Sequence, residues 1–275
     1  MATKSSIALK DGKVSYLYEA YLYEGRGDTM ILLHSMGVHS WSWQPVIPLL
    51  ARRFVIYGLD MLGHGDSDKP PRDYKISDFA ANVIEFMDRV KVRQAHIVGN
   101  SIGAIVGTEM AAAYPDRVRT LTLVGGPARG KAEFRESWAQ SASQYDEKGL
   151  RKPRTMEDLK GNFTKPTQEL LDKMNESMVK AGAWSKKTME ALLDYDLPER
   201  FPLIKCPTLI LFGERDTALR QKEQEMLRLI KGSKLVVMPN AGHLPQIDDP
   251  PAFVKAVEGF VAAASPAAGA TARGS

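Results

Sequence analysis

The chain has 275 residues, of which 44% are hydrophobic and 25% are charged, and its formal net charge is +4. These values are typical of a globular protein with one large domain. The Lys and Arg residues form no dense run, which argues against a nucleic-acid-binding protein, and no apolar stretch approaches the ~20 residues that a membrane span needs.

The N-terminal segment and the single cysteine bear on the cellular compartment. Residues 1–10 contain no apolar signal core, so we expect no secretion signal. Cys206 has no second cysteine to pair with, which fits a reducing, cytoplasmic location. We interpret Cys206 as a small packed residue rather than a nucleophile, because no histidine lies beside it in the sequence.

Short apolar runs alternate with amphipathic segments along residues 1–127 and again along residues 201–264. An apolar run between turn signals predicts a strand covered on both faces, and apolar residues at helical spacing, such as Phe79, Val83 and Phe86, predict helices. The alternation predicts an α/β domain with a mostly parallel sheet. The expected strands cover residues 6–9, 13–24, 29–33, 54–59, 94–98, 118–124, 207–212 and 234–238. The expected helices cover residues 41–51, 76–90, 102–114, 217–230 and 251–263.

The alternation is interrupted at residues 128–200, where helical patterns occur without a convincing strand. Residues 167–180 and 185–195 each place apolar side chains on one face of a helix. We interpret 128–200 as a helical cap inserted into a core domain formed by residues 1–127 and 201–264. Most of its Met and Trp residues would pack against the core, and a minority would line an apolar substrate cavity. The Ala-, Gly- and Ser-rich residues 265–275 predict a flexible tail.

The pattern Gly99-x-Ser101-x-Gly103 lies between an expected strand and an expected helix. A strand that turns sharply into a helix forces the turn residue into a strained conformation, with its side chain above the sheet. Gly99 and Gly103 have no Cβ, which allows the strand and the helix to approach closely. The helix N-terminus also supplies unpaired N–H groups that can stabilise negative charge. Ser101 is therefore a candidate nucleophile.

Two further loops follow expected strands and carry the other residue types that a serine nucleophile needs. Asp216 follows the strand at 207–212, and His243 follows the strand at 234–238. Because the loops beyond the carboxyl ends of parallel strands gather in one crevice, the three side chains can meet. A histidine can take the serine proton, and a carboxylate can orient the imidazole. The chain order Ser, Asp, His matches the nucleophile-elbow pattern.

With these motifs the chain resembles the α/β-hydrolase superfamily from about residue 13 to residue 261. Supporting motifs are Asp60-x-x-Gly63-x-Gly65-x-Ser67-Asp68-Lys69-Pro70, Gly213-x-x-Asp216 and Gly242-His243-Leu244-Pro245. The resemblance implies an eight-stranded, mostly parallel sheet flanked by helices, with a helical cap. It also implies an oxyanion hole formed by the backbone N–H groups of Met36 and Ile102.

Several residues compete with these assignments or modify them. Glu214 is an alternative to Asp216 as the acid of the triad. By resemblance, Asp60, His34 and His64 have structural roles. Members of the superfamily usually carry Gly where this chain has Ser35, which bears on the assignment of Met36 more than on that of Ile102.

Serine at the elbow favours the hydrolysis of a carboxylic ester, lactone or thioester of a small to medium apolar substrate. The Gly-Asn100-Ser elbow also resembles enzymes that hydrolyse carbon–carbon bonds in vinylogous β-diketones, although His243 is followed by Leu244 rather than by their usual Trp. A non-catalytic ligand-binding protein of the same fold is the second alternative. We expect a small-molecule substrate, no metal and no cofactor, and the sequence predicts no particular oligomeric state.

Overall fold

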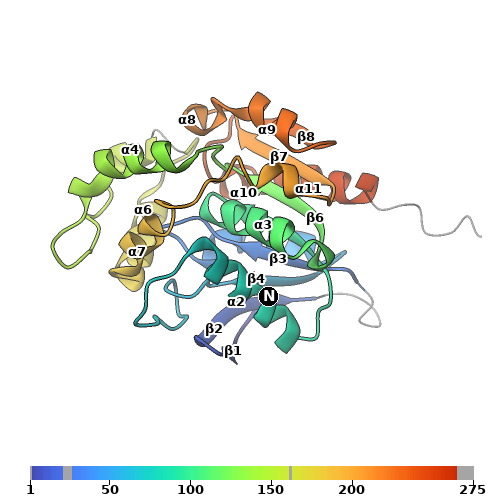
Figure 1. The fold of residues 1–275 in the computed structure, drawn as a ribbon, viewed down its shortest axis with the longest axis horizontal. Coiled ribbons are helices and arrows are strands. Elements are labelled where there is room, and N and C mark those ends of the chain that lie inside the picture. The colour runs from blue at the N-terminus through green and yellow to red at the C-terminus, as the bar shows by residue number, and fades with distance from the viewer. Residues whose placement is uncertain (1, 21–26, 161–162, 265–275) are drawn as a thin grey trace, which may run out of the picture.

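A computed structural model describes residues 2–20, 27–160 and 163–264 of the chain. The described residues form one eight-stranded sheet in the order β1-β2-β4-β3-β5-β6-β7-β8 (Figure 1). The hairpin β1–β2 is antiparallel, β2 pairs antiparallel with β4, and the remaining pairs are parallel, which confirms the predicted sheet. The strands are β1 (Thr3–Leu9), β2 (Gly12–Glu19), β3 (Thr29–Leu33), β4 (Val55–Leu59), β5 (Ala95–Asn100), β6 (Val118–Val124), β7 (Thr208–Gly213) and β8 (Lys234–Met238).

The central strands are continuous apolar runs because both of their faces are covered. Every residue of β5 and β7 is buried, and Ile31 of β3 pairs with Ile97 of β5 in the middle of the sheet. The second strand was predicted to extend to residue 24, but β2 ends at Glu19, and residues 21–26 lie outside the described residues.

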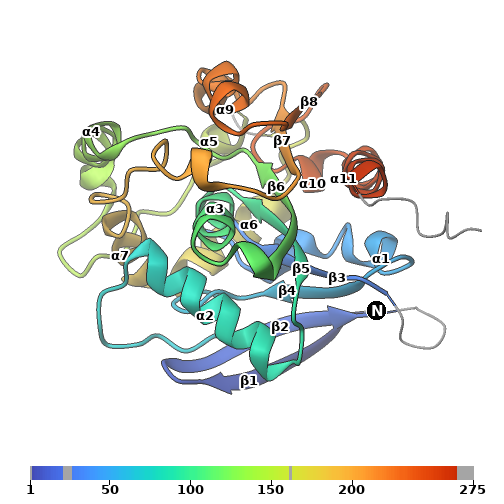
Figure 2. The same cartoon turned by 45° about the vertical axis from the view of Figure 1, so that its right-hand side comes forward.

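Helices cover the two faces of the sheet (Figure 2). On one face, α2 (Ile76–Arg89), α3 (Ile102–Ala113) and α9 (Glu223–Leu229) bury side chains such as Phe86, Met110 and Met226 in one apolar cluster. On the other face, α1 (Ile47–Leu50) and α11 (Pro250–Ala264) bury Ile47 and Val257 in a second cluster. The sheet therefore separates two cores, as in a three-layer α/β fold.

The helices predicted for residues 41–51 and 217–230 are each interrupted. The prediction for residues 41–51 was wrong in its middle, where a 3₁₀ turn (Ser40–Trp43) and α1 replace one helix. Pro45 lies in the interruption, and because proline has no N–H it cannot continue a helical hydrogen-bond pattern. The prediction for residues 217–230 was also wrong as one helix, since α8 (Thr217–Arg220) ends before α9 begins.

Residues between β6 and β7 form α4 (Lys131–Ser141), α5 (Met156–Lys160), α6 (Gln168–Ala181) and α7 (Trp184–Glu190), and α4, α6 and α7 lie together at the left of Figure 1. Thr167 caps α6 by accepting the Leu170 N–H at 3.1 Å. The α7 helix ends at Glu190, five residues earlier than predicted.

The inserted helices pack on loops that follow the strands of the sheet. Leu170 and Met174 of α6 share an apolar cluster with Val38, which follows β3, and Leu244, which follows β8. This packing supports our proposal that residues 128–200 form a cap over a core of residues 1–127 and 201–264. The predicted tail, 265–275, lies outside the described residues. No helix in the described ranges combines the length and apolar character that a membrane crossing needs.

Candidate active site

Ser101 occupies the turn between β5 and α3 in a strained backbone conformation. Its φ of 54° and ψ of −111° lie in a region that residues with a Cβ rarely adopt. The Ser101 N–H donates to the Val124 carbonyl at the end of β6, at 2.8 Å. The strain is therefore held in place by the neighbouring strand, and Ser101 begins the helix that follows.

The glycines on either side of Ser101 permit the close contacts that the elbow requires. A Cβ at Gly99 would collide with the backbone of Gly103, so the strand and the helix touch directly. A Cβ at Gly103 would collide with the carbonyl group of Leu33 at the end of β3. The N-terminus of α3 therefore packs against the loop that follows β3, which confirms the predicted need for glycine at both positions.

Asp216 and His243 come together from two different loops. The His243 Nδ1 atom lies 2.8 Å from the Asp216 Oδ2 atom, and the Asp216 side chain is buried whereas that of His243 is partly exposed. The pair lies over the end of β6, because a Cβ at Gly125 would be 3.0 Å from each of these two atoms. An imidazole whose Nδ1 faces a carboxylate keeps Nε2 available for proton transfer.

The side chain of Asn100 connects the elbow to the His243 loop. Its Nδ2 donates to the carbonyl of Val124 and to the carbonyl of His243, each at 3.1 Å. Within the described part of the chain, no hydrogen bond joins the Ser101 hydroxyl to the His243 ring. Such bonds are often long in ligand-free sites and tighten when substrate binds. Asp216 thus contacts His243 directly. Ser101 is connected to the His243 loop through its neighbour Asn100.

Two further carboxylates, those of Asp248 and Glu214, accept backbone N–H groups of the His243 loop, and the role of Asp248 was not predicted from the sequence. The Asp248 carboxylate accepts the N–H groups of Gly242 at 2.7 Å and Thr164 at 3.0 Å. Burial raises the pKa of Asp248, although these two hydrogen bonds act in the opposite direction. Glu214, the alternative acid, accepts the Asn240 N–H at 3.1 Å. Its contact is thus with the backbone of the loop, whereas the imidazole hydrogen bond goes to Asp216.

The two expected oxyanion donors are free to bind a ligand. Within the described ranges, neither the Met36 N–H nor the Ile102 N–H donates to a protein acceptor. The loop that carries Met36 is held by His34, whose Nε2 accepts the Met61 N–H at 3.0 Å. The other ring nitrogen, Nδ1, then carries the proton and donates to the Ser35 carbonyl at 2.8 Å. Burial lowers the pKa of His34 to about 4, which keeps it neutral.

Comparison with known proteins assigns this arrangement to a family. The family model described as "Alpha/beta hydrolase family" matches residues 30–256. The chain belongs to the α/β-hydrolase family. This assignment confirms the resemblance drawn from the elbow and its companion motifs.

Family relatives and solved structures match most of the chain. It is 25% identical over 243 residues to 3-oxoadipate enol-lactonase 2 of Acinetobacter baylyi, covering 86% of this chain and 91% of the relative. It is 27% identical over 258 residues to 2-hydroxy-6-oxo-6-(2'-aminophenyl)hexa-2,4-dienoic acid hydrolase of Metapseudomonas resinovorans, covering 88% and 86%. The crystal structure of a membrane phospholipase A, a bacterial virulence factor, superposes with a TM-score of 0.81 at 27% identity, covering 96% and 86%.

Asp60 supports the loops of this α/β hydrolase rather than its chemistry. Its carboxylate accepts the N–H groups of Ser40 at 2.9 Å and Asp66 at 3.0 Å, and His39 Nδ1 lies 3.3 Å away. Burial opposes ionisation, but these contacts outweigh it and hold the pKa of Asp60 below its usual value. His64 is buried nearby, and burial together with His34 lowers its pKa to about 3. These contacts agree with the structural roles that the resemblance implies.

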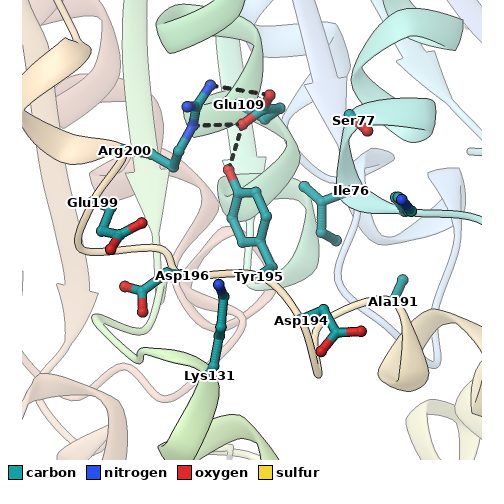
Figure 3. Close-up of a pocket in the computed structure, with 11 residues that line it drawn as sticks. Ile76, Ser77, Glu109, Lys131, Ala191, Asp194, Tyr195, Asp196, Glu199 and Arg200 are labelled. Atoms are coloured by element: carbon teal, nitrogen blue, oxygen red, sulfur yellow. Dashed lines mark hydrogen bonds and ion pairs between the residues drawn. The ribbon is translucent and has the colours of Figure 1, made fainter.

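A separate pocket of about 360 Å³ lies beside α3 (Figure 3), and no residue of the candidate triad lines it. Glu109 on α3 accepts hydrogen bonds from Tyr195 at 2.7 Å and from Arg200 at 2.8 and 3.1 Å. Glu109 is eight residues beyond Ser101, so the two lie roughly 12 Å apart along the helix. The described residues contain no group of three or more His, Cys, Asp or Glu side chains that could hold a metal ion.

Proposed function

We propose that this chain is a serine hydrolase that cleaves a carboxylic ester, lactone or thioester of a small to medium apolar substrate through an acyl-enzyme on Ser101. The observation that carries the proposal is the 2.8 Å hydrogen bond between His243 and Asp216 beside a strained serine elbow. A serine hydroxyl is a weak nucleophile at neutral pH and needs such a base.

The reaction follows from the arrangement of these groups. The Ser101 oxygen attacks the scissile carbonyl carbon while His243 Nε2 takes the hydroxyl proton. The tetrahedral intermediate collapses when the bond to the leaving group breaks, and His243 returns the proton to that group. A water molecule then attacks the acyl-enzyme with His243 again acting as base, which releases the acid and restores Ser101. Asp216 holds the imidazole tautomer and stabilises the imidazolium.

The negative oxygen of the intermediate requires fixed donors. The N–H groups of Met36 and Ile102 have no other acceptor within the described residues, and the α3 N-terminus adds a favourable dipole. Loss of one such donor typically costs ~3 kcal/mol of transition-state stabilisation. The unpaired state of both groups supports their assignment as the oxyanion hole.

The relatives support a hydrolase and the class of bond. The name of one relative describes an enol-lactonase, and the name of one structural neighbour describes a phospholipase. Lactones and phospholipids both contain a carboxylic ester. Together with the serine elbow, these names favour ester hydrolysis.

The proposal is tested by labelling and by turnover. A fluorophosphonate probe should label the wild-type protein and leave Ser101→Ala unlabelled. Steady-state hydrolysis of 4-nitrophenyl esters of several chain lengths should fall by about 10⁶-fold in Ser101→Ala. If the wild-type protein neither reacts with the probe nor turns over an ester or a vinylogous β-diketone, the non-catalytic ligand-binding alternative replaces this proposal.

Hydrolysis of a carbon–carbon bond is the second candidate, and a specific observation favours it. The relative from Metapseudomonas resinovorans is named as a dienoic acid hydrolase, and Asn100 of this chain supplies the Gly-Asn-Ser elbow that resembles such enzymes. A vinylogous β-diketone assayed beside the esters discriminates between the two. Faster turnover of the diketone would replace the ester assignment and retain the same candidate triad.

A further inference from the structure

Arg154 is a partly buried cation whose guanidinium has no hydrogen-bonded or ion-paired partner among the residues that the structure describes. It lies in the inserted helical region, two residues before α5. Its Nε atom is buried without a hydrogen-bond partner, and within the described ranges its guanidinium makes no hydrogen bond or ion pair with a side chain. By contrast, Arg117 lies 2.6 Å from Asp88, and Arg200 lies 2.8 Å from Glu109. Arg154 therefore differs from Arg117 and Arg200, because within the described residues its buried Nε–H group has no acceptor.

The guanidinium lies against the loop that carries the proposed oxyanion donor. A Cβ on Gly37 would be 3.4 Å from the Arg154 Nη2 atom, and Gly37 directly follows Met36. Because consecutive Cα atoms are about 3.8 Å apart, Nη2 lies within roughly 10 Å of the Met36 N–H. A ligand group bound to Arg154 would thus lie a few carbon atoms from a carbonyl held in the oxyanion hole.

Helix α6 fixes the position of this arginine. The Asn175 side chain accepts the backbone N–H of Arg154 at 2.8 Å and donates to the backbone carbonyl of Arg154 at 3.1 Å. One turn further along α6, the sulfur of Met178 packs on Gly37, where a Cβ would lie 2.7 Å from it. The same helix thus fixes the backbone of Arg154 and places the Met178 side chain at the loop, beside the Arg154 guanidinium.

Burial of an unpaired cation has a free-energy cost that a bound anion would offset. Burial and the nearby Arg151 lower the pKa of Arg154 to about 10, although Asp158 and Tyr145 act in the opposite direction. The side chain is still charged at neutral pH. A carboxylate is the natural partner, because its two oxygens match the planar fork of a guanidinium and can accept two parallel hydrogen bonds.

We propose that Arg154 binds a carboxylate of the substrate, so that the preferred substrates are esters or lactones that carry a second, ionised carboxyl group a few carbon atoms from the scissile carbonyl. This inference rests on the proposed hydrolase function and narrows it. The apolar chain between the two groups would lie near Met178, and the charged end would be neutralised by Arg154.

The test compares two substrates that differ only in charge. Mono(4-nitrophenyl) adipate carries a free carboxylate, and 4-nitrophenyl methyl adipate has the same chain with that group capped. The wild-type protein should prefer the free acid by at least tenfold in kcat/KM. In Arg154→Met this preference should disappear, because kcat/KM should fall for the free acid and change little for the methyl ester. Arg151→Met, which removes a cation from the same segment, should keep the preference.

A binding measurement separates this inference from the proposed function. Adipate should bind wild-type protein in calorimetry, with at least tenfold weaker affinity in Arg154→Met and unchanged affinity in Arg151→Met. The melting temperature of Arg154→Met should not fall, because the guanidinium makes no hydrogen bond or ion pair within the described residues that the substitution could remove. Equal use of the two esters, or equal adipate binding by wild type and Arg154→Met, overturns the role of Arg154. Normal adipate binding without labelling of Ser101 would overturn the hydrolase proposal and retain the anion site.

Discussion

At the scale of single residues, the contact between His243 and Asp216 has the most direct consequence. Asp216→Asn should lower kcat by about 10⁴-fold with little change in KM, because an amide cannot hold the imidazole in the required tautomer or stabilise the imidazolium. Steady-state hydrolysis of a 4-nitrophenyl ester measures this effect.

Glu214→Gln is the matched control for that change. It removes a nearby carboxylate that contacts the backbone of Asn240 and not the imidazole. Its activity should stay within a few-fold of wild type. The reverse pattern, in which Glu214→Gln is the inactive variant, would transfer the role of the acid to Glu214.

Residue types and chain order were sufficient to nominate Ser101, Asp216 and His243, because a serine elbow needs a base and an acid that follow later strands. Other residues of the site could not be found in this way. Asn100 donates to the carbonyl of a residue 143 positions later, and the buried Nε atom of Arg154 has no hydrogen-bond partner in the described part of the chain. A linear pattern records neither a distant contact nor a missing one.

At the scale of secondary-structure elements, the ion pair between Glu109 and Arg200 ties the end of the inserted region to α3 (Figure 3). Arg200→Met should lower the free energy of unfolding by about 2–3 kcal/mol, because the buried Glu109 carboxylate loses its countercharge and keeps only Tyr195 as a donor. Urea denaturation measures this change.

The exposed pair of Arg135 with Asp194 provides the comparison for that prediction. Arg135→Met should change the stability by less than about 0.5 kcal/mol, because solvent screens an exposed pair. The double variant Arg200→Met with Glu109→Met should recover part of the loss, since it removes the unpaired carboxylate. Equal stability of Arg200→Met and wild type would show that this ion pair does not hold the two elements together.

The periodic apolar patterns predicted most helices and strands to within a few residues, and the misses have local causes. At residues 41–51 the apolar spacing was helical, but the missing N–H of Pro45 interrupts the hydrogen bonding. Pattern alone also gave no bounds for α4 and α5, which are short or mostly exposed and so bury few side chains.

At the scale of the whole molecule, the parallel sheet explains why residues far apart in the chain share one site. Strands β3, β5, β6, β7 and β8 run in parallel, so the loops after them lie at one edge. Alternating strands and helices predicted this arrangement. The helical insertion was predicted to cap that edge, but its contacts were not, because they depend on which apolar side chains of α5 and α6 meet Val38 and Leu244.

Three histidines buried in different parts of the fold should make the stability of the whole protein depend on pH. Burial lowers the pKa of His34 to about 4, of His64 to about 3, and also that of His96. Between pH 4 and 6.5, His34 and His64 bind a proton in the unfolded chain, where the pKa is about 6.5, and bind it more weakly in the folded one, and the lowered pKa of His96 acts in the same direction. The free energy of unfolding should therefore be greatest above pH 6.5 and should decrease as the pH falls toward 4.

The variant His64→Gln isolates one of these contributions. With a pKa of about 3 in the folded state and about 6.5 in the unfolded chain, His64 contributes up to about 1.4 kcal/mol per pH unit to the slope between pH 6 and pH 4. The slope of His64→Gln should therefore be smaller than that of wild type by about that amount. Urea unfolding at pH 4.5, 5.5 and 7.5 gives both slopes, and above pH 7 the difference between the two proteins should become constant. Parallel curves across the whole range would mean that His64 takes up its proton equally well in the folded state, contrary to the burial of both its ring nitrogens.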